Sequence, residues 1–283
     1  MSRIIDFHTH TFPDRIAGTA IQKLKANSGT ENFLSGTAEA LSASCARAGV
    51  DAAVILPVVT NPQSAAKINQ ASAALNTRFP ETHLLSFGGI HPDTPDAKAV
   101  LAEAAAQGLR GIKIHPPYQQ VAFNDIRYKR LIAWAEELGL MVVTHGGIDI
   151  GVPGDWCTPA MVREVLHEVQ PTRLVVAHLG GWQQWEQVLD LLCGEPVFLD
   201  TAFSYGSFAY RPEIPEAVRY RPLTEDQMVT LIRAHGARRI LFGTDSPWSD
   251  QKEQIHLIRS LPLTGEEKES ILGENGARLL GNR

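Results

Sequence analysis

Two histidines, His8 and His10, stand two residues apart in the apolar opening run at positions 4–10 of the chain. In a β-strand the side chains of residues i and i+2 point to the same side. Both imidazoles can therefore face a single ion, and imidazole is the commonest protein ligand for zinc and related divalent metals. The spacing predicts one half of a metal site at the end of the first strand.

Further polar side chains lie at or beside the ends of other apolar runs. Each run is short and is followed by small or turn-forming residues, as expected for strands that are buried on both faces in a parallel sheet. The residues are Lys113, His115, His145, His178 and Asp245. The sequence therefore predicts that several strand ends deliver imidazole, ammonium or carboxylate groups.

Eight apolar runs alternate with helical segments along the 283 residues. Parallel neighbours need long crossover connections, which are usually helices, and the chain length suits one barrel of about 250 residues with small insertions. We therefore expect an α/β fold, a single (β/α)8 TIM barrel with eight parallel strands and one domain at 1–283. The strands are expected at 4–10, 52–57, 83–89, 111–115, 140–144, 173–177, 197–200 and 239–243.

A doubly wound open sheet is the rival topology. It is disfavoured because a His-Thr-His-Thr-Phe-Pro segment follows the first strand, where a dinucleotide-binding sheet has its glycine-rich turn. Residues 11–37 are expected to form an active-site loop with some helix. A second loop, which contains Gly and Pro, is expected between strand five and Thr158. Helices are predicted at 37–48, 64–79, 94–107, 124–138 with Asn124 or Asp125 as its cap, 159–169, 182–192 and 224–235, and a closing helix at 264–280.

Composition narrows the class of partner. The net charge is −5 and the sequence pI is about 6.1, so the chain has no basic surface to attract nucleic acid. No segment approaches the roughly 18–20 apolar residues that a membrane span needs, and no signal peptide is apparent. We therefore expect a cytoplasmic protein that acts on a small molecule. The sequence does not fix the oligomeric state, and a homo-oligomer is compatible with it.

Several motifs together resemble one known family. They are Asp6-Phe7-His8-Thr9-His10, a histidine after strands five and six, and Gly243-Thr244-Asp245-Ser246-Pro247-Trp248. This set is similar to the amidohydrolase superfamily, and more narrowly to its amidohydrolase-related (amidohydrolase 2) branch, which includes aminocarboxymuconate-semialdehyde decarboxylase. The resemblance implies that His8, His10, His145 and Asp245 bind a divalent metal ion. It also implies that His178 contacts the substrate or a bound water.

The chemistry of these groups agrees with that implication. Neutral imidazole and carboxylate suit zinc, which is our first expectation, although manganese is also compatible. A bound metal makes water acidic enough to act as hydroxide near neutral pH. Asp245 can accept the proton from that water and is the leading candidate for general base as well as ligand. His178 would stabilise the developing oxyanion or share in proton transfer.

Lys113 and His115 share one face of strand four, and two interpretations follow. In the first, the Lys113 ammonium binds a substrate carboxylate and His115 assists, next to a single metal ion. In the second, Lys113 is carboxylated and bridges two metals, with His8, His10 and Asp245 on one and His145 and His178 on the other. We favour the first because members of the branch that this chain resembles usually look mononuclear.

Two further residues are expected to touch the substrate. Arg211 belongs to an aromatic segment at 203–220 that follows strand seven, and an arginine fork can bind a carboxylate in a bidentate manner. Surface packing or a dimer contact explains that segment equally well. Trp248 follows strand eight and would make the mouth of the pocket aromatic.

Three functions remain open. The first expectation is a metal-dependent hydrolase that uses metal-activated water on a small carboxylated ester, lactone or amide. The alternative is a non-oxidative decarboxylase or other lyase of the same branch, acting on an unsaturated or aromatic carboxylic acid. A non-catalytic metal-binding barrel is the third, and the intact set of four histidines and Asp245 disfavours it.

Overall fold

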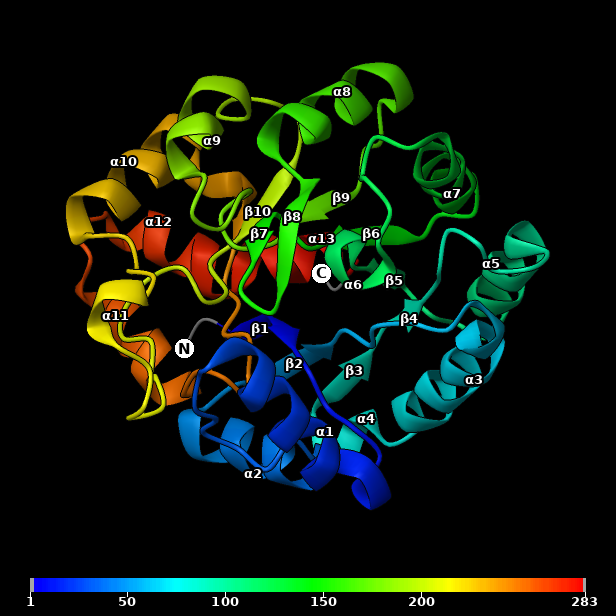
Figure 1. Cartoon of the computed structure of the whole chain (residues 1–283), viewed down its shortest axis with the longest axis horizontal. Coiled ribbons are helices and arrows are strands. Elements are labelled where there is room, and N and C mark those ends of the chain that lie inside the picture. Colours follow the sequence, from blue (N-terminus) through cyan, green and yellow to red (C-terminus); the bar gives the residue numbers. More distant parts are fainter. Residues whose placement is uncertain (1–2, 282–283) are drawn as a thin grey trace.

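Eight parallel strands form the centre of the computed structural model, which describes residues 3–281 (Figure 1). One of the eight is interrupted at Phe87 and carries two labels, β3 and β4. The strands are β1 (Ile5–Thr9), β2 (Ala52–Ile55), β3 (Leu84–Ser86) with β4 (Gly88–Gly89), β5 (Gly111–Ile114), β6 (Met141–Thr144), β9 (Leu174–Val176), β10 (Phe198–Asp200) and β11 (Ile240–Leu241). They match the predicted runs, with slightly shorter bounds.

The strands are paired in chain order and close into a ring. One sheet has the order β1-β2-β3, and the other has the order β4-β5-β6-β9-β10-β11. Backbone hydrogen bonds join the last strand to the first: the Phe7 N–H donates to Phe242 O at 2.7 Å, and the Asp245 N–H donates to His8 O at 2.8 Å. The chain is therefore a (β/α)8 TIM barrel, as predicted.

Helices surround the ring on its outside (Figure 1). Several begin at a side-chain cap where the sequence offers one, and Asp125, one of the two predicted caps, accepts the Arg127 N–H at 2.9 Å. The outer helices are α2 (Ala38–Ala48), α3 (Ala65–Asn76), α5 (Ala97–Ala106), α7 (Ile126–Glu137), α8 (Pro159–Val169), α9 (Trp185–Leu191), α10 (Glu225–His235) and α11 (Gln251–Ser260). The last of these was not predicted.

Two insertions stand over the end of the barrel where the strands terminate. The first is α1 (Asp14–Ser28), which lies inside the predicted active-site loop. The second is an antiparallel hairpin of β7 (Gly147–Asp149) and β8 (Val152–Cys157), in the segment that was expected to be irregular. Figure 1 shows this hairpin in front of the strands. The short helices α4 (Phe79–Thr82) and α6 (Pro116–Gln119) complete the connections.

The opposite end of the barrel is closed by the C-terminal segment. It consists of α12 (Gly265–Glu269), a π-helical turn at Ser270–Glu274 and α13 (Asn275–Leu279). The side chain of Asn275 donates to Ala237 O and Ile240 O, each at 2.7 Å, and so ties this segment to β11. The predicted closing helix is thus present, with a π-helical turn in its middle.

The interior of the barrel is apolar below the site. Phe7 of β1, Val54 of β2, Val143 of β6 and Val175 of β9 belong to one buried cluster that also contacts the C-terminal segment. The larger cluster lies between the strands and the outer helices. Across residues 3–281, no helix is both long enough and apolar enough to cross a membrane.

Candidate active site

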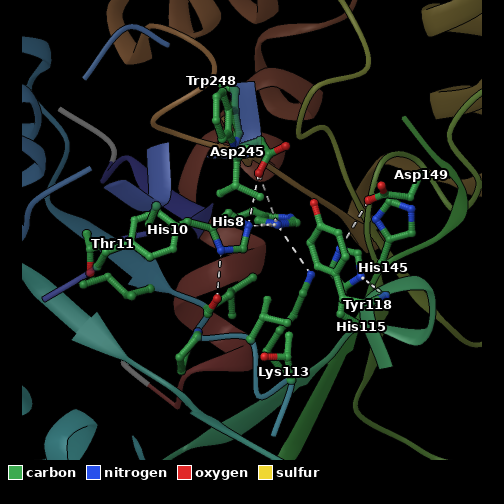
Figure 2. Close-up of a pocket in the computed structure, with 18 of the residues that line it drawn as sticks. His8, His10, Thr11, Lys113, His115, Tyr118, His145, Asp149, Asp245 and Trp248 are labelled. Atoms are coloured by element: carbon green, nitrogen blue, oxygen red, sulfur yellow. Dashed lines mark hydrogen bonds and ion pairs between the residues drawn. The ribbon is translucent and has the colours of Figure 1, made fainter. Parts of the chain in front are cut away.

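A cavity of about 880 Å³ opens at the ends of the strands, between α1 and the β7–β8 hairpin (Figure 2). Almost all the residues singled out in the sequence line it. They are His8, His10, Lys113, His115, His145, His178, Asp245 and Trp248. The predicted convergence of strand ends therefore places these groups around one cavity.

Arg211 is the exception among the predicted substrate contacts. It does not line the cavity, and its guanidinium pairs with Glu213 at the surface instead. Its backbone N–H donates to Gly29 O, which fixes this segment beside the end of α1. The guanidinium is therefore paired with Glu213 outside the cavity lining, and we do not assign it a substrate contact.

Three of the predicted ligands meet at one point. The Nε2 atoms of His8 and His10 lie 3.1 Å apart, and Asp245 Oδ1 lies 3.2 Å from His10 Nε2 and 3.7 Å from His8 Nε2. An irregular register between β1 and β2 at positions 6–9 accompanies this arrangement. Such irregularities re-aim side chains, and here Phe7 contributes to the apolar interior while its neighbour His8 faces the cavity.

The hydrogen bond of Nδ1 in each imidazole determines whether Nε2 of the same ring carries a proton or a lone pair. His10 Nδ1 lies 2.8 Å from the carbonyl oxygen of Leu56, which can only accept, so Nδ1 carries the proton. His8 Nδ1 lies 2.8 Å from Asp200 Oδ2 and donates in the same way. In neutral rings, both Nε2 atoms would therefore present lone pairs to one another and to the Asp245 carboxylate.

Three acceptor atoms facing one another repel unless a cation lies among them. Burial first, and then the nearby Lys113, lower the pKa of His8 well below its ordinary value, which disfavours an imidazolium as that cation. Burial would raise the pKa of Asp245, but a hydrogen bond with His10 and charge interactions with His8 and His10 outweigh burial and lower that pKa below its ordinary value. Two imidazoles and a carboxylate are a fitting donor set for a divalent metal ion.

His145 and His178 meet in a similar way beside this trio. His145 Nε2 lies 3.0 Å from Ile148 O, and His178 Nδ1 lies 2.8 Å from Ala202 O, so each of these nitrogens donates to a carbonyl. The remaining atoms, His145 Nδ1 and His178 Nε2, lie 3.1 Å apart with lone pairs toward each other. A shared proton or a cation must lie between them as well.

The structure groups His145 with a second set of side chains. Its ring lies 4.6 Å from that of His115, and His115 Nε2 lies 3.7 Å from Asp149 Oδ2. These three residues could themselves surround a cation, separately from His8, His10 and Asp245. The ring centroids of His178 and His8 also lie 5.3 Å apart, so neighbouring imidazoles line the cavity wall in series.

Lys113 projects into the barrel, as its place on β5 predicts. Its side chain is fully buried, and its Nζ lies 3.5 Å from His8 Nε2. Burial lowers the pKa of the ammonium to about 8, although the carboxylates of Asp200 and Asp245 oppose that shift. A buried ammonium without a bonded carboxylate is costly, so this group is suited to bind an anion that enters the cavity.

Two residues at strand ends are held in left-handed backbone conformations. The φ angle is 59° at both His178 and Asp245. Such conformations cost roughly 1–3 kcal/mol for residues other than glycine and cluster at functional sites. Asp245 is held there by the hydrogen bond from its N–H to His8 O, which links the two ligand-bearing strands directly.

Sequence reasoning missed three residues of the site: Asp200, Asp149 and Tyr118. Asp200 ends β10 and is fully buried, and its position at a strand end was a signal that could have identified it. Asp149 sits in the unpredicted hairpin, and the ring of Tyr118 stacks on His115 with centroids 4.2 Å apart. Neither of these two has a position in the sequence that marks it as part of the site.

Comparison with known proteins decides the family. The family model described as "Amidohydrolase" matches residues 5–281, which is almost the whole chain. The chain belongs to the amidohydrolase family. Amidohydrolases typically depend on a metal ion, in agreement with the donor set of His8, His10 and Asp245. A comparison with curated protein sequences gave no match.

Solved structures share the amidohydrolase barrel over its full length. A 2,6-dihydroxybenzoate decarboxylase in complex with 2,6-dihydroxybenzoate has 12% identity and a TM-score of 0.71, with 99% of this chain and 100% of that chain covered. The 5-carboxyvanillate decarboxylase of Sphingomonas paucimobilis has 14% identity and a TM-score of 0.65, with 99% of both chains covered. A protein named probable 2-pyrone-4,6-dicarboxylic acid hydrolase, from Acinetobacter baumannii, has 14% identity, a TM-score of 0.61 and 99% coverage of both chains. At such identities the likeness establishes the fold.

Proposed function

We propose that this amidohydrolase is a non-oxidative decarboxylase of an aromatic or unsaturated carboxylic acid. The observation that carries the proposal is the buried ammonium of Lys113 beside the cluster of His8, His10 and Asp245. A substrate carboxylate bound at this point would lie between the Lys113 ammonium and the candidate metal ligands. Two of the solved structures that share the fold are decarboxylases of aromatic acids, which supports the same reaction class.

The walls of the cavity suit a flat substrate. Tyr118, Trp182, Phe203 and Trp248 line it together with aliphatic side chains of the hairpin. Trp182 is fixed by a hydrogen bond from its indole N–H to Phe203 O at 3.0 Å. Aromatic rings offer large apolar surfaces at low conformational cost and stack on planar ligands. The substrate ring would therefore lie against these walls with its carboxylate directed to Lys113.

His8, His10 and Asp245 would hold the metal ion, with His145 as the fourth donor that family resemblance adds. The ion would supply Lewis-acid charge next to the carboxylate. Zinc is the first expectation for this donor set. His178 would contact the substrate, since it lines the cavity beside the His8 ring.

The bonds that break and form in a decarboxylation define a role for each of these residues. The bond between the ring carbon and the carboxylate breaks, its electron pair stays on the ring carbon, and carbon dioxide leaves. One proton must then reach that carbon. It would come from Nε2 of a doubly protonated His178, which would keep its Nδ1 proton toward Ala202 O and return to the neutral ring. Lys113 would bind the carboxylate before the reaction, and the aromatic walls would limit the access of water to the carbanionic carbon.

The test is turnover of the metal-loaded protein with aromatic acids, including 2,6-dihydroxybenzoate and 5-carboxyvanillate, in deuterated water. The proposal predicts release of carbon dioxide and one deuterium at the carbon that carried the carboxylate. The H178A variant should lose this turnover. Products that carry oxygen from labelled water, with no carbon dioxide released, would overturn it.

Hydrolysis of a small carboxylated ester, lactone or amide is the second candidate. It is favoured by the shared fold of the protein named as a probable 2-pyrone-4,6-dicarboxylic acid hydrolase. Here Asp245 would act as general base for water, and Lys113 would bind a substrate carboxylate that is retained in the product. Turnover of that lactone with uptake of oxygen from labelled water would establish this candidate over the first.

A further inference from the structure

Asp149 is a buried carboxylate that the proposed decarboxylation does not use. It lines the same cavity, its side chain is only 9% exposed, and it lies at the far side of the His115 and Tyr118 rings from His10 (Figure 2). Within residues 3–281, no lysine or arginine forms an ion pair with it. Its contacts are His115 Nε2, at 3.7 Å from Oδ2, and the backbone N–H groups of Gly151 and Val152, of which Gly151 N–H donates to Oδ1 at 2.8 Å.

His115 does not form a hydrogen bond with this carboxylate. Its Nδ1 accepts the Tyr118 N–H at 3.4 Å, so the proton of the neutral ring is on Nε2, on the side of Asp149. At 3.7 Å that contact is too long for a hydrogen bond. Within residues 3–281, Asp149 thus has neither an ion pair with a lysine or arginine nor a hydrogen bond from His115.

The position of Asp149 is fixed by the base of the hairpin. Gly147 forms a bridge with Trp182, the Ile148 N–H donates to Trp182 O at 3.2 Å, and the Trp182 N–H donates to Gly146 O at 2.8 Å. A side chain at Gly147 would place its Cβ 2.2 Å from Trp182 N, so this close approach requires glycine. The carboxylate is therefore preorganised at the cavity wall.

The cavity consequently has two poles: a buried ammonium at Lys113 and a buried carboxylate at Asp149. We propose that Asp149 binds a hydrogen-bond-donating substituent, a hydroxyl or amino group, on the ring of the carboxylic acid whose carboxylate meets Lys113. This inference rests on the proposed function for the placement of the substrate. Asp149, on the inserted hairpin, would then determine substrate specificity, because a donor group on the substrate would form a hydrogen bond that Asp149 otherwise lacks.

The test measures equilibrium binding by calorimetry, without turnover, on the metal-loaded protein. The ligands are benzoate, its three hydroxy and three amino isomers, and the methyl ethers of the hydroxy isomers. We expect at least one donor-bearing isomer to bind about tenfold or more tightly than benzoate, which corresponds to about 1.4 kcal/mol. Its methyl ether should lose that advantage, because an ether oxygen cannot donate.

The variants are D149N and D149A, with D155N as the matched control. Asp155 is an exposed carboxylate on the same hairpin. Both Asp149 variants should abolish the preference for the donor-bearing isomer while benzoate affinity stays the same, and D155N should change neither. Unchanged benzoate affinity also shows that the cavity has kept its structure.

Three results would overturn the subsite: no donor-bearing isomer binds more tightly than benzoate, the Asp149 variants keep the preference, or they weaken all ligands equally. Loss of one bound metal equivalent in D149N would show instead that His115, His145 and Asp149 hold a cation. A donor preference that depends on Asp149, in a protein that releases no carbon dioxide, would leave the subsite standing and refute the decarboxylase proposal.

Discussion

Asp200 Oδ2 accepts the Nδ1 proton of His8 at 2.8 Å, and this contact makes His8 Nε2 an acceptor toward the centre of the site. Oδ1 of the same carboxylate accepts the N–H groups of His178 and Ala202, each at 3.0 Å. One buried carboxylate thus fixes both the strand-one and the strand-six histidine. Hydrogen bonds of this kind set the tautomer and the direction of metal-binding histidines.

The D200N substitution tests that role. An amide has one acceptor and one donor end, so one end must face an N–H group, whichever way the side chain is turned. Metal affinity or turnover should fall by about 10- to 100-fold. D190N, an exposed carboxylate on α9, is the matched control and should leave both unchanged. A D200N protein with wild-type metal affinity and turnover would rule out the role.

Lys113 is predicted to bind substrate and not metal. The K113M variant should keep about one equivalent of divalent metal but lose affinity for aromatic carboxylates by about 100-fold, since charge-assisted contacts are the strong ones in a buried site. Elemental analysis and calorimetry give the two readouts. A wild-type protein with near two metal equivalents and a chemically modified Lys113 would favour the carboxylated, binuclear alternative.

Gly243 is predicted to leave room for His8. A methyl group at this position would lie 2.9 Å from His8 Cβ and 3.3 Å from Ala202 Cβ. The G243A variant should therefore lose about 1–3 kcal/mol of unfolding free energy and retain metal less well. G265A is the control, because a methyl group there meets no heavy atom within 4 Å. Equal behaviour of the two variants in urea unfolding and metal analysis would contradict this reading.

Asp125, the N-cap of α7, is predicted to make the free energy of unfolding depend on pH. Hydrogen bonds from the Arg127 side chain, and then from its backbone N–H, lower the pKa of Asp125 to about 2. Because this pKa lies below the ordinary value of 3.8, the contribution is present above about pH 4 and is lost as the pH falls toward 2. D125A should cost about 1 kcal/mol of unfolding free energy near neutral pH.

Urea unfolding of wild type and D125A at several pH values measures that contribution. The difference between the two should narrow as the pH falls below about 4, and D125N, which keeps a capping oxygen, should be the milder change. A difference that stays constant down to about pH 3, or grows, would contradict the assigned pKa shift.

The sequence predicted the barrel and most of the cavity because both depend on strands that are buried on two faces. His10, His145, His178 and Asp245 each follow such a strand, His8 lies near the end of β1, and parallel strands of a barrel end at the same side. Position along the strand therefore gave their location in space. Asp200 at the end of β10 has the same kind of position, which would have identified it as part of the site.

The insertions were not predictable in this way. The hairpin at 147–157 contains Gly147, Gly151 and Gly154 and lacks the alternation of apolar and polar residues that marks a strand. Its fold depends on the contacts with Trp182, which no local pattern encodes. Arg211 shows the reverse case, since an arginine near an expected loop carries no information on the direction of its side chain.

Elemental analysis of purified wild type, H10A and D245A is the decisive experiment for the metal site, with H256A as an exposed-histidine control on α11. We expect about one divalent metal ion per chain in wild type and H256A, and none in H10A or D245A, with all four proteins folded by circular dichroism. Retention of the ion in H10A or D245A, or no affinity of the wild type for any divalent metal, would contradict this expectation.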